Sequence, residues 1–152
     1  MRRGSLLLLA LAACGKEGSA AGQSPVSSEL SKLGHFEVTA RLADIQGQFP
    51  PNKLYDYVYV MKYDVLRVHR GIIEGKEIFV GHYNPLKSRL KAEDKFSGKV
   101  GGNVDRFQIG DVHRMALEAP LDQAMPMVGL IDKYIQTKGV RYWAIWVDRG
   151  QP

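Results

Sequence analysis

Four histidines, His35, His69, His82 and His113, are the residues of this chain best suited to binding a metal. Imidazole is a good ligand for both zinc and copper. His69 and His82 flank a predicted hairpin and would approach each other, and His113 would complete a site if its strand lay alongside. No two histidines have the i, i+4 spacing with a glutamate that metalloproteases use. We therefore predict no cofactor, and keep a cluster of His69, His82 and His113 as the alternative.

Aromatic residues on the predicted strands are a second possible site. Tyr55, Tyr57 and Tyr59 alternate and so share one face of a strand, and Trp143 lies on the last strand. If these side chains are exposed, they form a stacking platform on the face where OB-type barrels bind oligosaccharides or single strands. If they are buried, they fill the barrel, which is the commoner place for aromatic strand residues. Exposure of the tyrosine row would favour ligand binding, and its burial would count against it.

Nucleophilic and acid–base catalysis have little support in the sequence. There is no Gly-x-Ser-x-Gly elbow, and the glycine-rich stretch at 98–103 lacks the spacing of a phosphate-binding loop. The 16 Asp and Glu residues include no pair that the sequence itself places as acid and base for glycoside hydrolysis. Cys14 is the only cysteine, so no other residue supplies a thiol. We predict that the protein is not an enzyme.

The first 14 residues have the order of an export signal. Arg2 and Arg3 precede the apolar residues 6–13, which would span about 12 Å as a helix, against the ~30 Å of a bilayer core. Residues 11–14 (Leu-Ala-Ala-Cys) resemble the lipobox of bacterial lipoproteins. The resemblance implies cleavage before Cys14, a diacylglycerol thioether on its sulfur, and acylation of the new terminus, typically with palmitate. Two or three acyl chains would anchor the protein stably in a membrane.

This leader sets the predicted organisation and location. Residues 1–13 are the signal peptide, 14–29 a small, polar, flexible tether, and 30–152 a single folded domain. The pI is near 9.3 and the net charge is +5, or +3 without the leader, but an extracytoplasmic domain would not meet nucleic acid. A polysaccharide or another envelope protein is the expected partner. Gly15 replaces the aspartate that resembles an inner-membrane retention signal, which favours the outer membrane in a cell with two membranes.

Alternating apolar and polar residues predict that most of the remaining chain is β-strand. The richest segment is interrupted by Lys62 and Asp64, which predicts a bend or bulge there. A short helix is predicted over 127–134, and residues 85–103 are predicted to form a long exposed loop with one helical turn. Short connections favour an all-β, mainly antiparallel, OB-like barrel of five to six strands with one or two short helices. The predicted strands are 36–42, 55–69, 76–83, 112–118 and 141–148.

Part of this pattern is similar to the netrin- and tissue-inhibitor-type OB folds. The similar features are a long bent strand ending in Val-x-x-Val-x-Arg-Gly, a hairpin to Ile-Phe-Val, and a later Phe-x-x-Gly-Asp, here at 65–71, 78–80 and 107–111. The disulfide-forming cysteines of the animal members are absent, and the resemblance implies the fold alone. The sequence thus predicts a lipid-anchored, non-enzymatic envelope module that binds a polysaccharide or protein. A metal-assisted envelope enzyme and a structural or assembly subunit are the alternatives.

Overall fold

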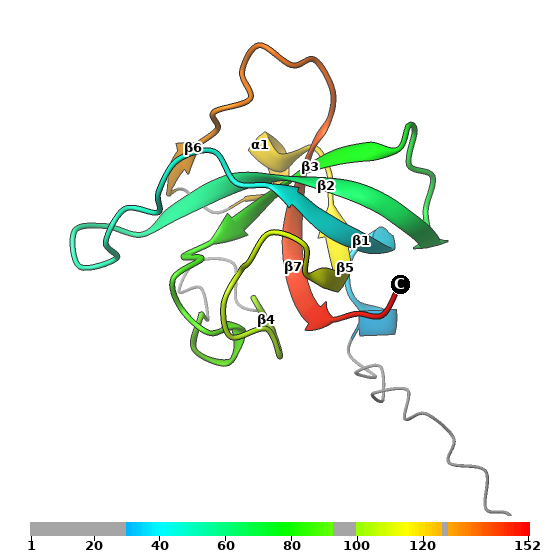
Figure 1. Cartoon of the computed structure of the whole chain (residues 1–152), viewed down its shortest axis with the longest axis horizontal. Helices are drawn as coiled ribbons and strands as arrows, with labels where there is room; N and C mark the ends of the chain where they lie inside the picture. Colours follow the sequence, from blue (N-terminus) through cyan, green and yellow to red (C-terminus); the bar gives the residue numbers. More distant parts are fainter. Residues whose placement is uncertain (1–29, 93–99, 126–127) are drawn as a thin grey trace, which may run out of the picture.

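The computed structural model describes residues 30–92, 100–125 and 128–152 (Figure 1). The predicted signal peptide, Cys14 and the tether lie outside the described residues. In the part of the chain that is described, no helix is long and apolar enough to cross a membrane.

Five strands close into a barrel (Figure 1). Their order around it is β1-β5-β7-β3-β2, and β2 pairs with β1 to complete the circuit. This confirms the predicted all-β barrel, and each of its five strands begins and ends within two residues of its predicted bounds. The strands are β1 (Phe36–Asp44), β2 (Tyr57–Arg70), β3 (Glu77–Tyr83), β5 (Val112–Glu118) and β7 (Arg141–Arg149).

The sheet is mixed rather than purely antiparallel. The other neighbouring pairs of the circuit are antiparallel, but β3 and β7 run parallel. The reason is topological: β3 and β5 run in opposite directions, so β7, which lies between them, must run parallel to one of the two. Two short strands also pair in parallel, β4 (Gly101–Gly102) with β7 and β6 (Gly129–Ile131) with β2.

The connection between β5 and β7 differs from its prediction. It begins with α1 (Leu121–Ala124), but the helix predicted over 127–134 is wrong, because residues 129–131 form β6. Met127 lies outside the described residues. The backbone of β6 pairs with residues 57–59 at the edge of β2. These backbone hydrogen bonds, which only the folded barrel can offer, outweigh a short stretch of helical spacing.

The connection between β3 and β5 contains the predicted helical turn, η2 (Arg89–Lys91). A second turn of this kind, η1 (Leu30–Lys32), precedes β1. The long β3–β5 connection is not simply exposed as predicted, because Arg89, Ala92 and Val100 are buried. Residues 93–99 lie outside the described part.

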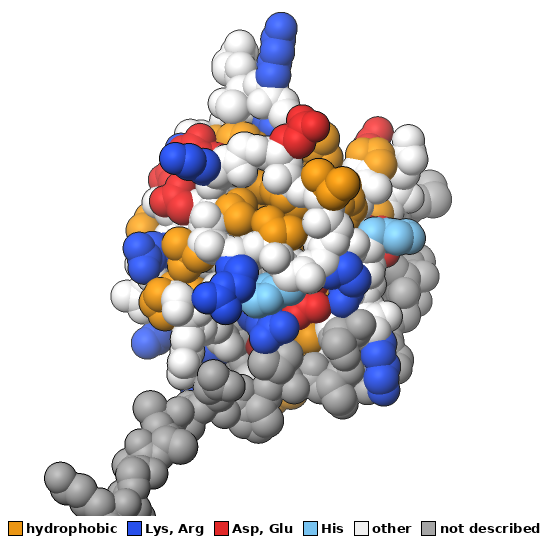
Figure 2. Space-filling view, turned by 90° about the vertical axis from the view of Figure 1, so that its right-hand side faces the viewer, with side chains coloured by type: hydrophobic (Ala, Val, Ile, Leu, Met, Phe, Trp, Pro, Cys, Tyr) orange, Lys and Arg blue, Asp and Glu red, His pale blue; other side chains and the backbone are white. Residues whose placement is uncertain are grey.

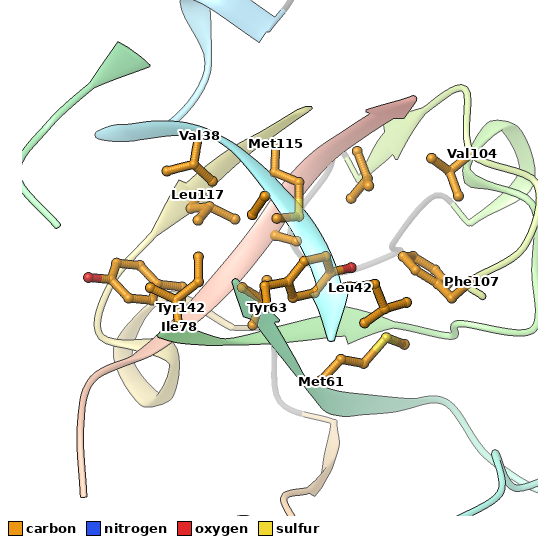
Figure 3. Packing of buried hydrophobic residues seen from close by; sticks show 14 of the residues in the cluster. Val38, Leu42, Met61, Tyr63, Ile78, Val104, Phe107, Met115, Leu117 and Tyr142 are labelled. Carbon is orange, nitrogen blue, oxygen red and sulfur yellow. The ribbon is translucent and has the colours of Figure 1, made fainter. Parts of the chain in front are cut away.

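One row of alternate residues from each strand fills the barrel, as the labelled side chains of Figure 3 show. From β2, Tyr57, Tyr59, Met61 and Tyr63 belong to this interior. The predicted irregularity is confirmed, since the β1–β2 ladder shifts register three times along β2. These shifts let the second half of β2 follow β1 after it has left β3.

The opposite face of β2, β3 and β7 is buried as well. There α1 and the segment after β6 cover a second apolar cluster, so the first half of β2 is enclosed on both sides. This cluster consists of Val58, Val60, Phe79, Tyr83, Val100, Leu121, Tyr134 and Trp143.

The two ends of the barrel differ. What we call the hairpin end is formed by residues 30–36, the β2–β3 turn and residues 138–140. The loop end is formed by residues 45–56, 103–111 and 149–152. The described chain enters the barrel at the hairpin end.

Candidate functional site

The predicted aromatic platform does not form. Tyr57, Tyr59 and Trp143 are buried, and only Tyr55, with 48% of its surface exposed, could touch a ligand. In the first half of β2, alternate residues point into the barrel, and the residues between them are covered by the second apolar cluster. Neither face of this half of the strand is therefore open to solvent. The prediction that these four residues share an exposed binding face is therefore corrected.

The buried tyrosines instead hold the β1–β2 connection in place. The Tyr57 hydroxyl donates to the Pro50 carbonyl at 2.6 Å, and the Tyr59 hydroxyl donates to the Gln46 carbonyl. Burial raises the pKa of Tyr57 to about 12, so its hydroxyl remains a donor at neutral pH. These side chains thus fix the loop end of the barrel rather than bind a ligand.

The histidines divide into two groups. His35 is exposed and pairs with Glu118, and His69 is exposed and bonds the Thr39 hydroxyl at 2.8 Å. His82 and His113, in contrast, are buried inside the barrel.

The alternative cluster of His69, His82 and His113 is therefore not formed, and the described residues contain no group of three or more His, Cys, Asp or Glu that could hold a metal. The physical reason is register. The β2–β3 pairing begins at Asp64 opposite Glu77 and places His82 opposite Tyr59, well away from His69. Residues 65–70 of β2 continue past β3 and pair with β1.

Tyr63 joins the two buried histidines. Its hydroxyl lies 3.0 Å from His82 Nε2 and 3.0 Å from His113 Nδ1, so it can donate to one ring and accept from the other. Burial lowers the pKa of His113 to about 4 and that of His82 well below its ordinary value. Both rings are therefore neutral at pH 7, and burial keeps the Tyr63 phenol neutral too by raising its pKa.

Arg89 and Phe107 complete this group. The Phe107 ring lies 4.5 Å from the His82 ring and 5.5 Å from the His113 ring, and the Arg89 guanidinium lies 5.1 Å from the centre of Phe107. We call Tyr63, His82, Arg89, Phe107 and His113 the inner cluster. It holds one cation among neutral rings.

A cleft of about 640 Å³ opens at the loop end, directly outside the inner cluster. His113 and Val104 lie in its wall, with Arg106 and Asp111 nearby. Arg149 also lines the cleft and pairs with Asp105 at 2.9 Å. Through His113 this polar cleft contacts the inner cluster.

A hollow of about 750 Å³ lies at the hairpin end and is mainly apolar. Figure 2 faces this end and shows hydrophobic side chains gathered in its centre, with charged groups around them. Ile72 in the β2–β3 turn is 86% exposed, and Val140 is 53% exposed. Glu74, Glu77 and Lys138 lie among its lining residues. The apolar lining is Phe36, Ile72, Ile78, Phe79, Ala119, Pro120, Val140 and Tyr142.

Neither the hollow nor the buried arginine was predicted from the sequence. A weak signal for the hollow exists, because Ile72 is a large apolar residue in a turn, where polar residues are usual. For Arg89 there was none, since a basic residue in a polar stretch predicts exposure.

Comparison of this chain with protein-family models, with curated proteins and with solved structures gave no match.

Proposed function

We propose that this protein is a membrane-anchored lipoprotein of the cell envelope, and that its barrel is a non-enzymatic module that binds another envelope protein in the hairpin-end hollow. The observation that carries the proposal is the hollow itself. Contiguous exposed apolar surface of this kind is typical of interaction sites. A polysaccharide is less suitable as the ligand, because stacking on sugar rings needs exposed aromatic faces and Tyr57, Tyr59 and Trp143 are buried.

The chemistry of the hollow fits a protein partner. Among its lining residues, Ile72 and Val140 expose aliphatic side chains to solvent, whereas Phe79 and Tyr142 are buried. A hollow of this volume accommodates a few apolar side chains, which become the buried core of an interface. The charged residues near it would form the polar rim and orient the partner.

The proposed membrane anchor is compatible with docking at the hairpin end. The lipobox-like residues 11–14 and the proposed tether, 14–29, precede Leu30, whose carbonyl lies beside Arg70 at the hairpin end. The 16 residues of the tether reach about 55 Å when fully extended. The first described residue and the hollow are thus at the same end of the barrel, and a tether of this length would bring the hollow within reach of a partner in or near the membrane. A structural or assembly subunit of an envelope complex would use the hollow in the same way.

Site-specific photo-crosslinking in cells that make the full chain tests the docking site. A crosslinking residue at position 72 or 140 should give the same discrete adduct. The control is position 54, because Leu54 is 74% exposed but lies at the loop end. The substitution Ile72→Glu should abolish the adduct formed from position 140, while Leu54→Glu should leave it unchanged. Equal adducts from all three positions, or no adduct from positions 72 and 140, would contradict the proposal.

The anchor is tested separately by labelled palmitate. The full chain should incorporate the label and fractionate with membranes, and Cys14→Ala should lose both properties. Label incorporation that survives this substitution would refute the lipoprotein assignment and leave the docking proposal standing.

A further inference from the structure

Arg89 is a buried charge without a counter-ion in the described part of the chain. Its side chain is 1% exposed, and none of the ion pairs among the described residues includes it. Burial lowers its pKa only to about 10, so the guanidinium is charged at neutral pH. A buried and unpaired charge is costly, and folded proteins rarely keep one without a partner.

The neighbours of Arg89 do not neutralise this charge. His82, His113 and Tyr63 are neutral, and the positive charge of Arg89 itself helps to lower the pKa of both histidines. The Asp111 carboxylate, which lines the loop-end cleft, acts to raise the pKa of His113 and Tyr63, but it forms no ion pair with Arg89 among the described residues. The guanidinium therefore still lacks an anionic partner in the described part of the chain.

The same cluster contains hydrogen-bonding capacity that the described residues do not use. Arg89 Nη2 donates to the carbonyl oxygens of Asn84 at 2.8 Å and Lys87 at 3.0 Å, but Nε and Nη1 have no partner. His82 Nδ1 also has no partner, although it is buried. Buried nitrogens of this kind are nearly always satisfied by something, often a water or an ion.

One set of proton positions on His82, Tyr63 and His113 satisfies both of their hydrogen bonds and leaves a donor free for a ligand. If His82 carries its proton on Nδ1, then Nε2 accepts the Tyr63 O–H, and the Tyr63 oxygen accepts the Nδ1–H of His113. His82 then presents a donor, as Arg89 does twice. An oxyanion has only acceptors and carries the missing charge.

The loop-end cleft borders the inner cluster. Val104 and His113 line the cleft, and the Val104 carbonyl accepts the backbone N–H of Arg89 at 2.8 Å. The cleft lining contains Arg106 and Arg149 together with Asp105 and Asp111, and Arg149 is paired with Asp105. Arg106 takes part in none of the ion pairs among the described residues and is the lining cation left to attract an anion.

We propose that the inner cluster is a binding site for a small oxyanion group, a phosphate or a carboxylate, that enters through the loop-end cleft and takes Arg89 as its counter-ion. The site lies at the opposite end of the barrel from the hollow, and the inference does not depend on the docking proposal.

Thermal unfolding of the detergent-solubilised full chain tests the site, with inorganic phosphate, acetate and chloride compared at equal ionic strength and pH 7.5. Phosphate or acetate should raise Tm by a few degrees in a saturable manner, whereas chloride should not. Whichever of phosphate and acetate binds more tightly shows whether the natural ligand group is a phosphate or a carboxylate. In Arg89→Met, a change of similar volume, binding should weaken at least tenfold. Arg67→Gln is the control, because Arg67 is exposed on β2 and outside the cleft, and it should leave the saturable response unchanged.

A second measurement does not depend on how well Arg89→Met folds. In the unaltered protein, NMR signals of Arg89 Nε–H and the His82 ring should shift along one saturable phosphate or acetate curve. The proposal is overturned if Tm and these signals follow ionic strength alone. It is also overturned if they respond only after Glu93→Gln and Asp94→Asn, because a carboxylate of the chain itself would then be the counter-ion.

Discussion

At the scale of single residues, the hydroxyl of Tyr63 has the most consequences. It joins His82 and His113, which are 19 and 50 residues away in the chain, and all three side chains are buried. A buried imidazole nitrogen that loses its partner has no water to replace it. The hydroxyl therefore stabilises two rings at once, and it holds His113 where the loop-end cleft begins.

Replacing Tyr63 with phenylalanine tests this. Tyr63→Phe leaves His82 Nε2 and His113 Nδ1 without a partner, and we expect the free energy of unfolding to fall by about 2–4 kcal/mol. Tyr142→Phe is the matched control, because Tyr142 is also a core residue but its hydroxyl makes no hydrogen bond within the described residues. It should change stability by no more than about 0.5 kcal/mol. Urea unfolding measures both, and similar losses in the two variants would contradict this role of Tyr63.

At the scale of elements, β2 and β3 show how the barrel is covered on its outside. Gly81 of β3 lies beneath α1, at a point where β2 and α1 approach the backbone closely. A Cβ atom added at Gly81 would lie 2.7 Å from Val58 Cγ1 and 3.0 Å from Leu121 Cδ1. A glycine is needed here because of this close packing.

We expect Gly81→Ala to lower the free energy of unfolding by about 1–3 kcal/mol, because Val58 or α1 must move to make room. Gly129→Ala on β6 is the control, since the nearest atom would be 3.8 Å away, an ordinary contact. Chemical unfolding followed by tryptophan fluorescence compares the two. A Gly81→Ala protein as stable as Gly129→Ala would show that α1 packs less tightly than the structure indicates.

At the scale of the whole molecule, the two ends of one barrel differ in chemistry. The hairpin end has a mainly apolar hollow, and the loop end has a polar cleft that contacts the inner cluster through His113. Small single domains usually unfold as one cooperative unit, so we expect protonation of the buried cluster to affect global stability.

The expected pH dependence follows from His113. Its pKa is about 4 in the folded protein and about 6.5 when unfolded. Between these values the unfolded chain binds a proton that the folded barrel does not, so stability is highest above pH 6.5 and falls toward pH 4. The loss is on the order of 3 kcal/mol, and His82 adds to it in the same direction.

Tm measured at steps from pH 7.5 to pH 4.5 tests this dependence. His113→Gln removes the titrating group and should flatten the slope of Tm with pH, whatever its effect on Tm itself. His35→Gln is the control, since His35 is exposed, and it should leave most of the slope. Identical slopes in the two variants would contradict the assignment.

The amino-acid sequence by itself determined the strands of the barrel and their approximate bounds. This was possible because alternation of apolar and polar residues is a local property of a half-buried strand. The irregularity of β2 was local too, since Lys62 and Asp64 interrupt its pattern. The lipoprotein signal, from the two arginines to Cys14, is likewise a local pattern that needs no structure to be recognised, and it remains a prediction.

Only the tertiary structure decided which face of each strand lies inside and which residues meet. The tyrosine row had the same pattern whether buried or exposed, and its burial depended on barrel closure and on the segment that covers β2 and β3. Register separated His69 from His82 and brought His113 to Tyr63. The inner cluster and the hollow both combine residues from distant parts of the chain, and the burial of Arg89 comes from packing around it. Such contacts have no local signal, because burial is a property of the assembled barrel and not of a sequence window.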